Sequence, residues 1–85
     1  MQNMRIFPNP ASDYLITEFE LNQPERIALS LRDLAGRVVA VNYLDFDSGI
    51  QTHKFTLPVG IPAGMYLIHA QGSRTQSLAR VLIKH

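Results

Sequence analysis

Short segments in which apolar and polar residues alternate recur along this chain of 85 residues, and Gly, Pro, Asn or Asp bound each of them. Alternation with a period of two places every second side chain on the same face of a β-strand. The clearest case is 27–32, where Ile27, Leu29 and Leu31 would share one face. The sequence therefore predicts strands joined by turns.

We expect strands at 14–21, 27–32, 38–46, 50–57, 65–70 and 74–83, after a short extended piece at Ile6 and Phe7. In the first of these, Leu15, Thr17, Phe19 and Leu21 would lie on one face. A helix that begins at Ser12 or Asp13 is the alternative there, since Leu15 and Phe19 are four residues apart. The segment is short and β-branched, which favours the strand. About seven strands in all predict an all-β fold, an immunoglobulin-like antiparallel β-sandwich.

Length allows only one folded unit, and we expect a single domain over 1–85, with 1–6 as residual linker and 7–85 as the sandwich. The chain has no cysteine, so packing alone must hold the domain together. The longest apolar runs are four residues, far below the roughly 18–20 that cross a bilayer. The first residues lack the apolar core of a secretory signal peptide, so an exported form would be a longer precursor.

Charge is unevenly distributed, although the formal net charge is only +1. All seven acidic residues lie in the first 47 positions, whereas the last 35 positions carry four basic residues and no acid. Arg74, Arg80 and Lys84 have the spacing to share one face of the last strand. Three charges without interleaved aromatic residues make a weak basic patch, so we expect no nucleic-acid partner.

The search for catalytic or ligand-binding motifs points away from an enzyme. His53 and His69 fall in predicted strands and His85 is the last residue, with no spacing that would bind zinc. Residues 45–49 resemble the start of a calcium loop but lack the later ligands. No serine lies in a G-x-S-x-G motif and no glycine-rich phosphate loop occurs. We expect no catalytic residue, no cofactor and no metal.

Tyr66 follows a Pro/Gly corner, 58–64, at the start of the penultimate strand. Sandwich domains often place a tyrosine at this position, with the phenol bonded to backbone a few residues upstream. A structural role for Tyr66 is therefore favoured over contact with a ligand.

Four motifs together resemble the type IX secretion C-terminal sorting domain family. They are Phe7-Pro8-Asn9-Pro10-Ala11, Leu29-x-Leu31-x-Asp33-x-x-Gly36-Arg37-Val38-Val39, Pro62-Ala63-Gly64-Met65-Tyr66-Leu67-Ile68 and Arg80-Val81-Leu82-Ile83-Lys84. Each motif is weak by itself, but their order and spacing match the family over nearly the whole chain. His85 extends slightly beyond the usual terminal basic residue.

The resemblance implies a non-catalytic sorting signal that directs a secreted cargo across the outer membrane of Bacteroidetes. The implied partners are the outer-membrane type IX translocon with its shuttle components, and a sortase-like cysteine peptidase that removes the domain upstream of Pro8. The cargo would pass through the periplasm and be attached at the cell surface or released outside the cell. The implied recognition residues are Gly64, Tyr66, Arg74, Arg80, Val81, Leu82, Ile83 and Lys84. The implied structural motif residues are Pro8, Asn9, Pro10, Ala11, Asp33, Gly36 and Arg37.

Two alternatives remain open at this point. An adhesive, carbohydrate-binding or spacer module would need exposed aromatic residues on a flat sheet face, and the candidates are Tyr14, Tyr43, Phe46 and Phe55. A last strand that must be available to a partner can also exchange between copies, which would give a strand-swapped homodimer.

Overall fold

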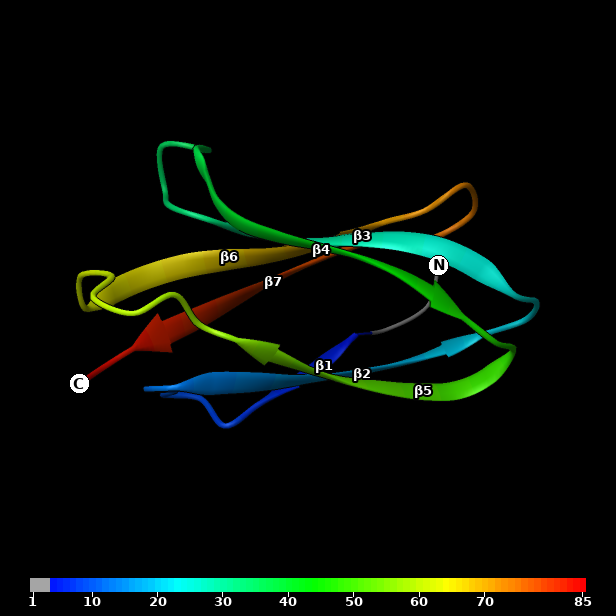
Figure 1. Cartoon of the computed structure of the whole chain (residues 1–85), viewed down its shortest axis with the longest axis horizontal. Helices are drawn as coiled ribbons and strands as arrows, with labels where there is room; N and C mark the ends of the chain where they lie inside the picture. The colour runs from blue at the N-terminus through cyan, green and yellow to red at the C-terminus, as the bar shows by residue number, and fades with distance from the viewer. Residues whose placement is uncertain (1–3) are drawn as a thin grey trace.

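The computed structural model describes residues 4–85. Within them it contains seven strands and no helix. They are β1 (Arg5–Phe7), β2 (Tyr14–Leu21), β3 (Glu25–Arg32), β4 (Val38–Phe46), β5 (Gly49–Thr56), β6 (Gly64–Gln71) and β7 (Gln76–Ile83). Figure 1 shows these strands in two layers packed face to face. The predicted all-β sandwich of about seven strands is confirmed, and the helix alternative for the segment after Ser12 is wrong.

The two layers are a three-stranded sheet, β1-β2-β5, and a four-stranded sheet, β4-β3-β6-β7. Every strand pair is antiparallel. β4 and β5 are edge strands of different sheets, and the chain crosses between the layers from one to the other. Between these two strands, His53 Nε2 lies 3.0 Å from Asn42 Oδ1. This hydrogen bond joins β5 to β4, so it ties the two sheets together along one side of the sandwich.

The core is built from the inward faces that alternation predicted. Leu15, Thr17, Phe19 and Leu21 of β2 are all buried, and so are Ile27, Leu29 and Leu31 of β3. Phe19 packs edge-on against Phe46 with 5.0 Å between the ring centroids. β2 and β3, one from each sheet, therefore contribute every second side chain to one shared core.

Several strand ends differ from the sequence prediction. β1 begins at Arg5 and pairs with β2, so it takes in two residues that the predicted boundary left in the linker. Residues 1–3 of that linker lie outside the described residues. β3 begins at Glu25 rather than at 27, and β7 begins at Gln76 rather than at 74. Within 4–85 there is no helix with the length and apolar character needed to cross a membrane.

Candidate functional site

Tyr66 closes the corner that precedes β6. Its hydroxyl donates a hydrogen bond of 2.6 Å to the carbonyl oxygen of Pro62, four residues upstream, and the side chain is buried. The upstream backbone bond expected for this tyrosine is present. Because the hydroxyl is already bonded, Tyr66 acts inside the domain by fixing the path of 62–66 into β6.

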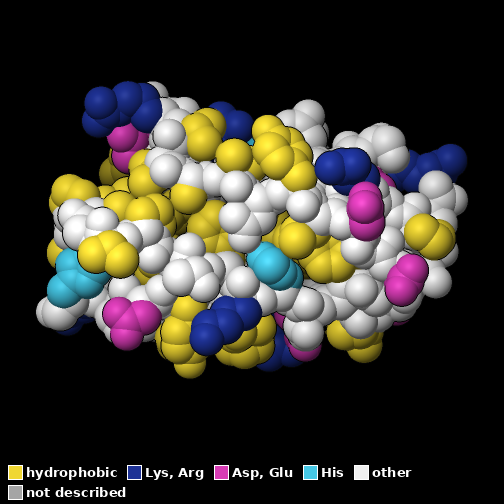
Figure 2. Space-filling model, in the orientation of Figure 1, with side chains coloured by type: hydrophobic (Ala, Val, Ile, Leu, Met, Phe, Trp, Pro, Cys, Tyr) yellow, Lys and Arg dark blue, Asp and Glu magenta, His cyan; other side chains and the backbone are white. Residues whose placement is uncertain are grey.

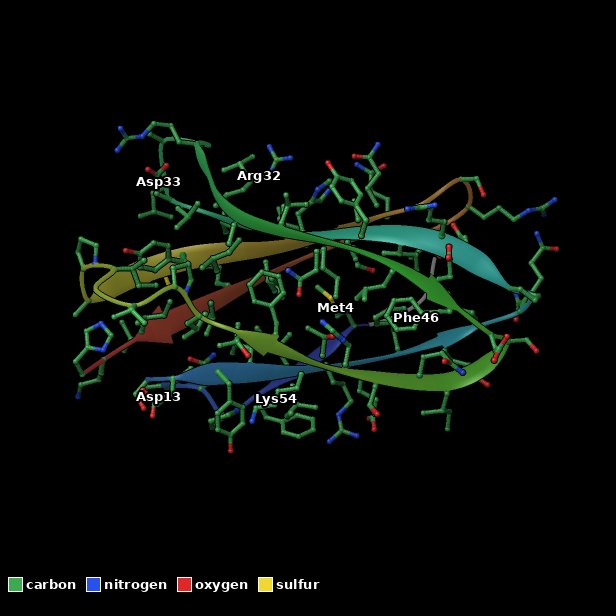
Figure 3. All side chains as sticks on the ribbon, in the orientation of Figure 1. Met4, Asp13, Arg32, Asp33, Phe46 and Lys54 are labelled. Carbon is green, nitrogen blue, oxygen red and sulfur yellow. The ribbon has the colours of Figure 1, made fainter. Side chains whose placement is uncertain are left out.

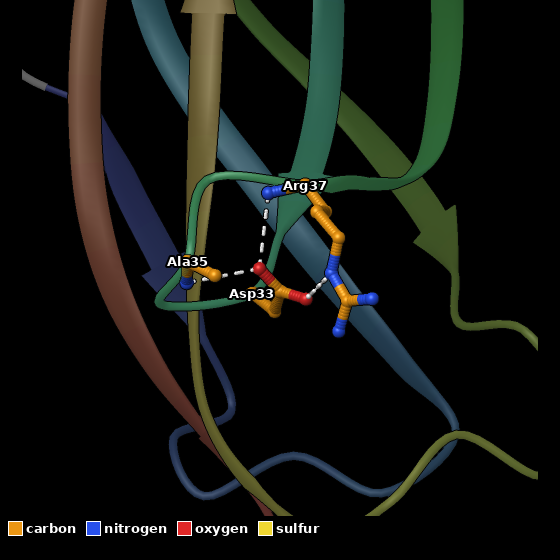
Figure 4. A network of polar contacts seen from close by, with 3 residues as sticks. All are labelled: Asp33, Ala35 and Arg37. Carbon is orange, nitrogen blue, oxygen red and sulfur yellow. Dashed lines mark hydrogen bonds and ion pairs between the residues drawn. The ribbon is translucent and has the colours of Figure 1, made fainter.

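Asp33 organises the turn between β3 and β4 (Figure 4). Its Oδ1 accepts hydrogen bonds of 3.0 Å from the backbone N–H groups of Ala35 and Arg37, and its Oδ2 accepts one of 2.9 Å from Arg37 Nε. Gly36 has a φ of 89°, a conformation that glycine adopts without steric cost. Asp33, Gly36 and Arg37 therefore each have a local structural role in this turn.

The charge state of Asp33 follows from these contacts. The backbone hydrogen bond from Arg37 is the main reason that the pKa of Asp33 lies below its usual value. Loss of solvent around the carboxylate opposes this effect, and the hydrogen bond and charge of the Arg37 side chain add to the lowering. Asp33 is ionised at neutral pH and neutralises Arg37 beside it.

The segment Pro8–Ala11 lies along the outer edge of β7. Asn9 Oδ1 accepts a hydrogen bond of 3.0 Å from Leu82 N–H, and Ala11 N–H donates one of 2.9 Å to Leu82 O. Lys84 N–H donates to Ala11 O at 2.8 Å, which makes a short parallel bridge centred on Ala11 and Ile83. The first and last segments of the domain are thus paired, although they are more than 70 residues apart.

The last strand presents two different faces. Val81 and Ile83 are fully buried in the core, whereas the side chains of Arg80 and Lys84 are exposed and that of Leu82 is partly exposed. After the strand, His85 Nε2 lies 2.8 Å from the carbonyl oxygen of Ile61. β6 and Ala11 therefore hold the backbone of 81–84, and the His85 side chain contacts the corner at Ile61.

Four motifs that are far apart in sequence meet at one end of the sandwich, the end that carries the C-terminus in Figure 1. Asp33, Arg37, Pro62 and Tyr66 line a common cavity of about 450 Å³. Gly64 pairs with Ile83 across β6 and β7, and Ala11 bridges the same residue from the other side. We call this end the motif end; it consists of 8–11, 33–37, 61–66 and 80–85.

Arg74 does not belong to the motif end. It lies in the turn before β7, while Lys84 follows the strand, and ten residues of extended chain separate them by about 30 Å. The prediction that Arg74 shares one face of the last strand with Arg80 and Lys84 is wrong for Arg74. Because Arg74 belongs to the turn, the strand begins at Gln76, two residues later than the sequence pattern predicted.

Sequence reasoning missed the residue that holds this turn, Glu25. Its side chain is buried, and its carboxylate accepts hydrogen bonds from Arg74 N–H at 2.7 Å, Thr75 N–H at 2.9 Å and Thr75 Oγ1 at 2.8 Å. Burial acts to raise the pKa of Glu25, but these bonds and the charge of Arg74 outweigh it and lower the pKa below its usual value. The sequence offered one signal for it. Glu25 lies two residues before Ile27 and four before Leu29, so alternation places its side chain on the same inward face.

The histidines have structural surroundings. Burial lowers the pKa of His53, and burial together with the nearby charge of Arg32 lowers the pKa of His69. His53 bonds to Asn42, and His69 lies on the outer face of β6. Among residues 4–85, no group of three or more His, Asp or Glu side chains is arranged to hold a metal ion.

Comparison with known proteins gives one result that covers almost the whole chain. A family model described as a secretion system C-terminal sorting domain matches residues 5–84. A search of the curated proteins found none that matches. The matched range begins at the first residue of β1 and takes in all four segments of the motif end.

Proposed function

The chain belongs to the family of secretion system C-terminal sorting domains, and from that premise we propose that the type IX export machinery reads its motif end in the folded state. Members of this family are the C-terminal sorting signals of precursors exported by the type IX system, and the family is not catalytic.

The observation that carries the proposal is the way the last strand is held. Hydrogen bonds between this strand and both Asn9 and Ala11 on one side, and pairing with β6 on the other, fix the backbone of 82–84. Val81 and Ile83 anchor it in the core. Because the backbone of this strand is already ordered, a partner that binds it does not have to order the backbone as well, which favours recognition of a folded end over an unfolded tail.

This arrangement separates the predicted recognition residues by role. Arg80, Leu82 and Lys84 have side chains that a partner can contact, so we assign direct recognition to them. Tyr66, Val81 and Ile83 are buried, so their contribution is to hold the exposed residues in place. Gly64 pairs with Ile83 at the start of β6, and Arg74 is assigned no contact at the motif end.

The finer steps of export are also proposals. The translocon and its shuttle components would bind the motif end, and a sortase-like cysteine peptidase would later remove the domain and attach the cargo at the cell surface. A peptidase needs extended backbone that is not already paired. Because β1 pairs with β2 from Arg5 onward, the cut would fall upstream of Arg5. The cargo would thus pass through the periplasm before it reaches the cell surface or the medium.

The adhesion alternative receives no support from the aromatic residues. Phe46 and Phe55 are buried, and the two exposed rings, Tyr14 and Tyr43, belong to different sheets. No two of these four candidates share an exposed sheet face. The strand-swapped homodimer stays a prediction.

A reporter assay tests the proposal. A periplasm-targeted reporter is fused upstream of the full chain in a bacterium with a type IX system, and the secreted fraction is measured. We expect export with the chain and retention without it. Deletion of 81–85 should abolish export, and circular dichroism of the truncated domain reports how much of that loss is unfolding. Equal export with and without the chain would contradict the proposed function.

A further inference from the structure

The outer face of the four-stranded sheet carries two basic residues in register. Arg32 of β3 pairs with Leu67 of β6, and Leu67 pairs with Arg80 of β7. Residues directly opposite each other on neighbouring strands project from the same face. Since strands lie about 4.8 Å apart, the Cα atoms of Arg32 and Arg80 are separated by about 10 Å across Leu67.

Neither arginine has a carboxylate partner within residues 4–85. Arg32 Nε donates a hydrogen bond to Ser30 Oγ at 3.2 Å, which leaves its terminal nitrogens free, and Arg80 makes no ion pair there. The one acidic residue on this face, Asp45, lies 4.0 Å from Arg26. The strands of this face therefore carry two unneutralised positive charges.

The opposite sheet has a charge-balanced outer face, which provides an internal comparison. Its strands carry Arg5 and Lys54 against Glu18 and Glu20, and Arg5 Nη1 bonds Glu18 Oε1 at 3.1 Å. Lys54 Nζ lies 4.8 Å from the centre of the Tyr14 ring. In Figure 3, Arg32 and Lys54 project from opposite sides of the sandwich.

Apolar side chains accompany the two arginines. Val41 lies opposite Ser30, Ser30 opposite His69, and His69 opposite Leu78, so this row crosses all four strands. Leu78 is 61% exposed and Tyr43, next to Val41 on β4, is 65% exposed. Figure 2 shows apolar side chains along this upper side of the molecule, with basic and acidic side chains beside them. A shallow depression of about 250 Å³ between β4 and β6 includes Arg32, Tyr43 and His69 in its lining.

We propose that this surface, defined by Arg32, Val41, Tyr43, His69, Leu78 and Arg80 and called the cationic face, docks an acidic protein segment of the export machinery. Carboxylates of that segment pair with Arg32 and Arg80, and an apolar side chain between them packs on Leu67 and Leu78. The inference rests on the proposed function and extends the recognised surface from the motif end onto β3 and β4.

Charge and apolar exposure together select this partner. Two separated guanidinium groups match two carboxylates, each able to bond in a bidentate manner. Exposed Leu78, Val41 and Tyr43 gain nothing from a purely polar polyanion, whereas an apolar side chain flanked by acids buries them. Complementary charge also speeds the encounter and fixes the register of the bound segment.

Arg32 provides the decisive variant, because it lies on β3, away from the terminal strand. In the reporter assay, Arg32→Glu should lower the rate of export about tenfold while the domain keeps its wild-type circular dichroism spectrum and melting temperature. Arg32→Lys should recover part of the export, since it keeps the charge but loses the bidentate geometry of the guanidinium group. Lys54→Glu, on the opposite sheet, is the matched control and should export like the wild type.

The outcomes separate the inference from the proposed function. If the wild-type fusion is not exported at all, the proposed function fails. If Arg80→Glu lowers export and Arg32→Glu does not, the terminal strand alone is read, and the cationic face is overturned while the proposed function stands.

Photocrosslinking identifies the occupant. A benzophenone amino acid at position 43 or 78 should form an adduct with a protein of the export machinery during secretion, and the adduct should be lost in the Arg32→Glu background. The same group at Ile50, 70% exposed on the opposite sheet, should give no such adduct. An anionic glycan or lipid as the occupant would show charge-dependent export without a protein adduct at 43 or 78, and that result would also overturn the proposal.

Discussion

Replacing Glu25 by alanine should remove the anchor of the β6–β7 turn. Three hydrogen bonds end on the Glu25 carboxylate, two from backbone N–H groups of Arg74 and Thr75 and one from the Thr75 hydroxyl. A hydrogen bond to a charged acceptor contributes about 1.5–3 kcal/mol, but the three are not additive and water can reach part of the freed turn. We expect Glu25→Ala to lower the free energy of unfolding by about 3 kcal/mol.

Thermal unfolding followed by circular dichroism measures this effect. For a domain of this size, about 3 kcal/mol corresponds to a fall in melting temperature of about 12–24 °C. Glu25→Gln keeps the volume and one acceptor oxygen, so its cost should be about half as large. Glu20→Ala is the matched control, because Glu20 is an exposed acid on β2, and it should change the melting temperature little.

The pH dependence gives a second test of the same anchor. The pKa of Glu25 is lower in the folded than in the unfolded state, so its contribution is complete above the unfolded-state value of about 4.5. That contribution is lost as the pH falls through the lower folded-state pKa. The difference between wild type and Glu25→Ala should therefore shrink in acid. A difference below about 0.5 kcal/mol at pH 7, or one that does not change in acid, would refute this reasoning.

Three further perturbations have defined outcomes. Asn9→Ala removes the acceptor for Leu82 N–H, so hydrogen exchange at that amide should accelerate and stability should fall by about 1 kcal/mol; unchanged exchange would show that Asn9 does not hold the strand. Tyr66→Phe should cost about 1 kcal/mol through the lost bond to Pro62, whereas Tyr43→Phe, whose ring is mostly exposed, should cost almost nothing in the same urea titration. The lowered pKa of His53 means that the unfolded state takes up a proton first, so stability should fall as the pH drops below about 6.5, and His53→Gln should flatten that slope.

Alternation along the chain predicted the inward faces because it is a local property. Leu15, Phe19, Ile27 and Leu29 all lie where the period of two places them. The turn at 33–36 and the bond of Tyr66 were also predictable, because each is completed within five residues. These features need no knowledge of which strands become neighbours.

The contacts that complete the fold and the candidate site were not predictable in this way. Asn9 meets Leu82 across 73 positions, and Glu25 meets Thr75 across 50. No periodicity links such distant residues, and an acid such as Glu25 at an inward position is easily taken for part of a turn. The same long-range contact holds the backbone N–H of Arg74, which lies in the turn before the last strand. The register of Arg32 with Arg80 likewise depends on β6 lying between them.

The deletion of 81–85 removes Val81 and Ile83 from the core, so it cannot by itself distinguish lost recognition from lost folding. A variant that keeps both buried residues and reverses only exposed charges avoids this difficulty. Arg80→Glu combined with Lys84→Glu meets that condition, since both side chains are exposed. Circular dichroism at equal concentration confirms that the variant is folded before export is compared.

The secreted fraction of a reporter that carries this double variant, relative to the wild-type chain, is the most direct test of recognition at a folded motif end. We expect the folded variant to be retained in the cell, while the wild-type fusion and the Lys54→Glu control are exported. Export of the folded double variant at the wild-type level would contradict the assignment of recognition to the exposed side chains of the last strand.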